Sequence, residues 1–114
     1  MAVLLDRTHP LPGGPRVRLR LARPGDRADL HELLERLGLE AEDIDVRRAL
    51  RCTPGHALSI CATAWDGSRE RLVGIGTLSL SGRRHTLLAE DRRVARLLAH
   101  GLGEHAGTWA RRVA

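Results

Sequence analysis

The sequence predicts an α+β domain with a mostly antiparallel sheet of four strands, two helices after the first strand and one C-terminal helix. Three patterns carry this prediction. Apolar and charged residues alternate over residues 16–21, which is typical of a half-buried strand. Leucines recur at helical spacing over residues 30–37. Two further strand-like segments flank the turn sequence Asp66-Gly67-Ser68, which indicates a hairpin.

The N-terminal half divides into a leader, a strand and two helices. Residues 1–15 contain three prolines and two glycines, so we expect a flexible leader before a single domain over residues 16–114. A chain of 114 residues is too short for two independent cores. Asp26 is the expected N-cap of the first helix, and Gly38 is its expected C-cap. A second helix is expected over residues 41–50.

The C-terminal half predicts three strands and a long helix. The strands are expected at residues 57–65, 71–80 and 85–89. Gly74 and Gly76 lie inside the middle one of these, which predicts a bulge or a close approach of another backbone. From residue 91 the pattern is helical, with one face formed by Val94, Leu97, Leu98, Leu102, His105 and Trp109.

Composition excludes several classes of protein. The 19 basic residues are all arginine, and the formal net charge is +5. The arginines at both ends of the chain favour an anionic partner, or simply form a solvated surface. The composition does not favour nucleic acid as a partner, because Phe and Tyr are absent and Trp occurs only twice. No segment is apolar enough to span a membrane, no secretory signal is evident, and the two cysteines predict a reduced, cytoplasmic protein. The spacing of His and Cys predicts no metal site.

Two segments resemble the N-terminal part of the GNAT (GCN5-related N-acetyltransferase) superfamily. The string VRLRLARPGDRADLHELLERLG, residues 17–38, is similar to the first strand, Pro/Gly-Asp turn and first helix of that family. The string ALSICATAWDGSRERLVGIGTLSL, residues 57–80, is similar to its second and third strands, including Val-Gly at residues 73–74. The resemblance implies a truncated member of the fold that binds acetyl-CoA and, if active, transfers an acyl group to an amine.

The resemblance also assigns site residues. It implies that the fourth strand binds the cofactor through Leu87 and Leu88, and that Arg92, Arg93 and Arg96 hold its phosphates. Glu90 and His85 are the candidate bases for the incoming amine. The family turn Q/R-x-x-G-x-G/A is shortened here, and Leu97 stands where a phosphate needs bare backbone. The acidic pair Glu90 and Asp91 has a simpler interpretation, in which it favours the N-terminus of the last helix.

Two functions of different classes therefore stay open. The first is a GNAT-like acyl-CoA-dependent protein, active or retained as a regulatory domain. The second is a small interaction module without cofactor. If the sheet ends at the fourth strand, the run Thr86-Leu87-Leu88-Ala89 lies on an open edge. We expect that edge to form a homodimer or to bind a larger protein partner.

Overall fold

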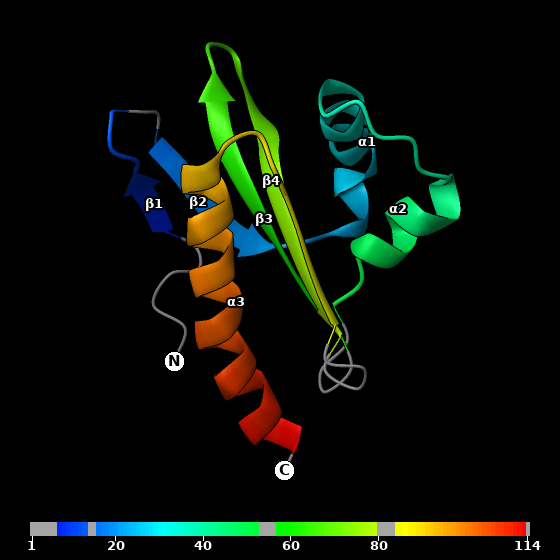
Figure 1. Ribbon diagram of the computed structural model, residues 1–114, viewed down its shortest axis with the longest axis vertical. Coiled ribbons are helices and arrows are strands. Elements are labelled where there is room, and N and C mark those ends of the chain that lie inside the picture. Colours follow the sequence, from blue (N-terminus) through cyan, green and yellow to red (C-terminus); the bar gives the residue numbers. More distant parts are fainter. Residues whose placement is uncertain (1–6, 14–15, 53–56, 80–83, 114) are drawn as a thin grey trace.

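The protein is an antiparallel sheet covered by helices on both faces, as its computed structural model shows (Figure 1). The structure describes residues 7–13, 16–52, 57–79 and 84–113, without the side chains of residues 66, 84 and 105–113. The strands are β1 (Arg7–Pro10), β2 (Arg16–Leu21), β3 (Ala57–Asp66), β4 (Arg69–Ser79) and β5 (Arg84–Ala89). The helices are the short 3₁₀ turn η1 (Pro24–Asp26), α1 (Arg27–Arg36), α2 (Asp43–Ala49) and α3 (Arg92–Val113).

The strands follow one another across the sheet in the order β1-β2-β3-β4-β5, and every pair is antiparallel. The α+β class, the antiparallel sheet and the three α-helices are therefore confirmed. The predicted count of four strands is wrong, because residues 7–10 of the expected leader pair with residues 16–19 as a fifth strand. The residues at 14–15, between these two strands, lie outside the described part of the chain.

The sheet separates two apolar cores. On one face, α3 packs through Val94, Leu98 and Leu102 against Val17, Leu19, Leu58, Ile60 and Ala62 of β2 and β3. On the other face, α1 and α2 pack through Leu30, Leu33 and Val46 against Cys61, Leu72 and Ile75. The described part of α3 buries Val94, Leu98 and Leu102 as expected. The side chains of His105 and Trp109, placed by the sequence on the same face, lie outside the described residues.

Strand β4 contains a bulge next to a glycine that α3 contacts closely. Ala62 pairs with Gly74 and Thr63 pairs with Leu72, so Val73 is an extra residue between two partners on β3. A Cβ on Gly74 would lie 2.8 Å from Val94 Cγ1 and 3.0 Å from the carbonyl oxygen of Leu88. Both predicted meanings of the strand glycines, a bulge and a close approach, are confirmed.

The first helix ends as the sequence predicts. Gly38 has a φ of +70°, its N–H donates to the Glu35 carbonyl, and the Leu39 N–H donates to the Leu34 carbonyl. These two bonds form a Schellman motif, which needs a left-handed residue at the position of Gly38. The turn sends the chain towards α2, which begins at Asp43 rather than at residue 41.

Candidate functional site

Strand β5 forms one edge of the sheet, as the sequence predicts for the last strand of this sheet. The Glu90 N–H, directly after β5, donates to the Val73 carbonyl on β4 at 3.0 Å. Because backbone groups alternate in direction along an antiparallel strand, the N–H and C=O groups of His85, Leu87 and Ala89 face away from β4. The edge therefore presents backbone donors and acceptors that no other strand of the described chain pairs with.

Apolar pockets lie on both faces of the sheet beside β5. On the α1–α2 face, Thr86 and Leu88 line a pocket of about 200 Å³ with Leu34, Val46 and Ile75. On the α3 face, His85 and Leu87 line a pocket of about 260 Å³ with Leu78, Leu102 and two small residues of α3, Ala99 and Gly103. Leu87, Leu88 and Ala89 are only half-buried. The apolar surface along β5 is thus incompletely covered by the described part of the protein.

The start of α3, where the resemblance implies a phosphate site, is capped by its own chain. An Asp91 Oδ1 oxygen accepts hydrogen bonds from the Arg93 N–H at 2.8 Å and from the Val94 N–H at 3.1 Å. The Arg93 side chain and these backbone bonds lower the pKa of the Asp91 carboxyl. An N-cap carboxylate in this position satisfies two of the free helix amides that a phosphate would use. This arrangement supports the simpler interpretation of Asp91 as a helix cap.

The three candidate phosphate arginines are not equivalent. Arg93 donates to the Pro12 carbonyl at 2.7 Å and pairs with Asp91 at 3.1 Å, so it ties the start of α3 to the N-terminal segment. Arg92 and Arg96 are exposed, and neither has a hydrogen-bond or ion-pair partner among the described residues. Because they are four residues apart on α3, they share one helix face. Among these three arginines, Arg92 and Arg96 have no partner in the described chain, whereas Arg93 already holds two.

The two candidate bases lie apart. Glu90 pairs with Arg36 at 2.7 Å and with Arg71 at 3.7 Å, and these pairs join the end of β5 to α1 and β4. His85 is exposed near the other end of β5. Glu90 follows His85 by five positions, which corresponds to about 17 Å of extended chain. The structure therefore does not bring Glu90 and His85 together at one reacting atom, and Glu90 already has structural partners.

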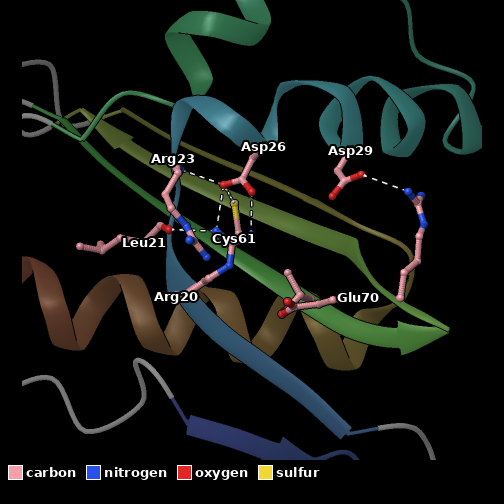
Figure 2. A network of polar contacts seen from close by, with 9 residues as sticks. Arg20, Leu21, Arg23, Asp26, Asp29, Cys61 and Glu70 are labelled. Atoms are coloured by element: carbon pink, nitrogen blue, oxygen red, sulfur yellow. Dashed lines mark hydrogen bonds and ion pairs between the residues drawn. The ribbon is translucent and has the colours of Figure 1, made fainter. Parts of the chain in front are cut away.

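A buried ion pair, absent from the sequence-based predictions, joins β2 to η1 (Figure 2). Arg20 donates to Asp26 through two nitrogens, at 2.6 Å and 2.9 Å, and both side chains are less than one-tenth exposed. Burial opposes ionisation of Asp26, but hydrogen bonds from Arg20 and from the Arg23 N–H outweigh it and lower its pKa. Asp26 is the N-cap residue of α1, as the sequence predicts, but its carboxylate accepts no hydrogen bond from the amides of that helix and is bonded to Arg20 and the Arg23 N–H instead.

Cys61 lies against this pair. Its thiol donates to Asp26 Oδ2 at 3.7 Å, and it is fully buried (Figure 2). Burial, reinforced by the negative charge of Asp26, raises the pKa of the Cys61 thiol far above its usual range. A thiol held in its neutral form is a poor nucleophile. The predicted structural role of Cys61 as a small apolar residue is consistent with this environment.

Comparisons with protein-family models, with curated proteins and with solved structures found no match. Within the described residues, no helix combines the length and apolar character needed to cross a membrane. In the same residues, no three His, Cys, Asp or Glu side chains gather as metal ligands do.

Proposed function

We propose that this protein is a small interaction module that forms a homodimer through the β5 edge. The observation that carries the proposal is a sheet edge with outward-facing backbone groups at Leu87 and Ala89, flanked on both faces by half-buried apolar side chains. An edge of this kind is a template for pairing with another strand.

The opposite edge of the sheet lacks these properties. Strand β1 has only four residues and carries Arg7 at its start and Pro10 at its end. Short length, charge and proline are the features by which natural edge strands avoid pairing. Residues 85–89 of β5, in contrast, contain no proline and no acidic or arginine side chain. The difference between the two edges favours β5 as the interface.

A second copy of the chain fits this edge by symmetry. Antiparallel pairing of two β5 strands about Leu87 places Leu87 opposite Leu87 of the second copy, and His85 opposite Ala89. All of these residues have backbone groups that face away from β4. No like-charged arginine or acidic side chains meet within residues 85–89.

The helices leave room for such a dimer. Helix α3 packs on β4 and β3, so the two α3 helices of a continuous sheet would be separated by three strand spacings, about 14 Å. That separation exceeds the usual 8–10 Å between packed helices, so the helices do not collide. Leu87 and Leu78 from both copies would fill part of the space between them.

Leu87→Lys is expected to convert the dimer to a monomer. The substitution places two ammonium groups opposite each other at the centre of the paired strands, whereas in the monomer the long side chain reaches solvent. Analytical ultracentrifugation at about 100 μM should show a dimer for the wild type and at least a tenfold weaker association for the variant. The matched control is Thr8→Lys on β1, which should leave the dimer intact. A wild-type protein that is monomeric at this concentration would contradict the proposal.

A second candidate function is binding of acetyl-CoA without a defined transfer step. It is supported by the outward-facing amides of Leu87 and Ala89 and by Arg92 and Arg96, which are unpaired among the described residues and lie just beyond the same strand. The Asp91 cap argues against a family-type pyrophosphate turn, because the amides of Arg93 and Val94 are already used. Any cofactor would depend on the strand edge and the two arginines.

Calorimetric titration with acetyl-CoA tests this candidate. Micromolar binding by the wild type, lost in Arg92→Ala/Arg96→Ala, is the result expected if the site holds the cofactor. Arg7→Ala, which removes one charge from the opposite edge of the sheet, is the control for a general loss of positive charge. Absence of heat at millimolar acetyl-CoA excludes the cofactor and leaves the interaction module.

A further inference from the structure

An open pocket of about 660 Å³ lies where the end of β2 meets the start of α1 and the end of α2. It is separate from the β5 edge, because none of its lining residues belongs to β5, β4 or α3. Its volume falls within the range typical of small-molecule sites. Three arginines reach it from two helices and the segment after α2, namely Arg27, Arg47 and Arg51.

Two of these arginines are held in place by a shared acid. Arg27 Nε lies 2.8 Å from one oxygen of Asp43, and Arg47 Nε lies 2.9 Å from the other. A guanidinium carries five N–H donors, so each arginine keeps donors for a second acceptor. Asp43 therefore positions the two guanidinium groups without using all of their hydrogen-bonding capacity.

The third arginine lacks such an acid. The side chain of Arg51 has no ion-pair or hydrogen-bond partner among the described residues. The three arginines that line the pocket, together with the aspartate that pairs with two of them, carry a formal charge of +2. Charge of one sign in a concave site attracts ligands of the opposite sign more strongly than the same charge spread over a convex surface.

The remaining wall of the pocket is mostly apolar. Ala22 and Leu50 are buried, and Pro24 and Cys52 complete the lining. The thiol of Cys52 is already hydrogen-bonded to the Ser59 backbone, donating to its carbonyl at 3.2 Å. The pocket thus combines a positive rim with a mostly apolar wall.

From this combination we infer that the pocket binds a small organic phosphomonoester. Such a ligand carries a charge of about −1.5 to −2 at neutral pH, which matches the rim, and its three phosphoryl oxygens accept hydrogen bonds from planar guanidinium groups. Its organic part lies against Ala22, Pro24 and Leu50. The inference does not depend on β5 pairing or on acetyl-CoA.

Titration with phenyl phosphate, followed by the backbone amide resonances of Ala22, Leu50 and Arg51, tests the inference. We expect saturable shifts at these residues with a dissociation constant of millimolar or below. Phenyl sulfonate, a monoanion with the same ring, should bind at least tenfold more weakly. Inorganic phosphate, which lacks the ring, should also bind more weakly than phenyl phosphate.

Arg51→Ala should weaken phenyl phosphate binding at least tenfold, because Arg51 is the arginine without an acidic partner. The matched control is Arg48→Ala, which removes the same charge from α2 at a residue that does not line this pocket. Equal weakening by both variants would show general electrostatic attraction and overturn the inference. Absence of saturable shifts in the wild type at 10 mM phenyl phosphate (about 3 kcal/mol of binding free energy) would also overturn it.

Discussion

Asp26→Ala is expected to lower the free energy of unfolding by about 3–5 kcal/mol, the usual cost of removing one partner from a buried ion pair. The variant leaves the guanidinium of Arg20 buried without its carboxylate. Arg20 Nε already has no hydrogen-bond partner, so little in its surroundings can replace the lost contact. The Arg23 N–H loses its acceptor as well. Urea unfolding followed by circular dichroism measures the loss.

Two further variants separate the ion pair from a general effect of losing an acid. Asp29→Ala removes the same side chain three residues later, where its pair with Arg69 spans 3.8 Å and is partly exposed, so we expect a loss of at most about 1 kcal/mol. Arg20→Leu/Asp26→Ala removes both charges and should recover part of the stability lost in Asp26→Ala. The single variant Arg20→Leu completes the cycle. If its loss of stability and that of Asp26→Ala simply add up to the loss of the double variant, the pair contributes no coupling and this explanation fails.

The pH dependence of stability has a defined sign for this pair. The pKa of Asp26 is lower in the folded protein than its ordinary value of 3.8. Stability contributed by its carboxylate is therefore complete above pH 3.8 and is lost as pH falls through the lower folded pKa. The difference in stability between the wild type and Asp26→Asn should shrink over this acidic range. The same difference should stay constant between pH 5 and pH 7.

The fold was largely predictable because its signals are local. The leucine spacing of α1 and the glycine after it specify the helix and its Schellman end with no reference to the rest of the chain. Strand β1 was missed because prolines and glycines surround it, and only its pairing with β2 makes residues 7–10 a strand. The alternation in β2 marked the strand correctly but did not show that Arg20 is buried, since that depends on Asp26, six residues away and beyond a turn.

The candidate sites were less predictable than the fold, because the partners of each arginine depend on how distant segments pack together. Sequence placed Arg92, Arg93 and Arg96 together, but only the structure shows that Arg93 is used by Asp91 and Pro12 while the other two are unpaired in the described chain. The pocket of Arg27, Arg47 and Arg51 joins residues up to 24 positions apart through helix packing. No local spacing rule connects such residues. A search of the sequence for clusters finds arginines that are neighbours along one helix. It misses arginines that come together from two different helices.

Gly74→Ala is expected to lower the free energy of unfolding by about 1–3 kcal/mol, the range for overpacking a core. The added Cβ would lie 2.8 Å from Val94 Cγ1 and 2.9 Å from Leu98 Cδ1. A side chain could turn away, but the Leu88 carbonyl at 3.0 Å is backbone and belongs to the neighbouring strand. Relief therefore requires α3 or β5 to move. Thermal unfolding measures the effect.

The control for the effect of this substitution on stability is Gly103→Ala on α3. No atom lies within 4 Å of its Cβ position, so the variant should stabilise the protein by about 0.5–1 kcal/mol through helix propensity. Opposite signs for the same chemical change would establish that α3 rests directly on the backbone of β4. Because β5 lies beside Gly74, a shift of this strand would also disturb the proposed interface. Gly74→Ala should therefore weaken dimerisation as well as folding. A neutral Gly74→Ala would mean that α3 packs less closely on the sheet than the structure shows.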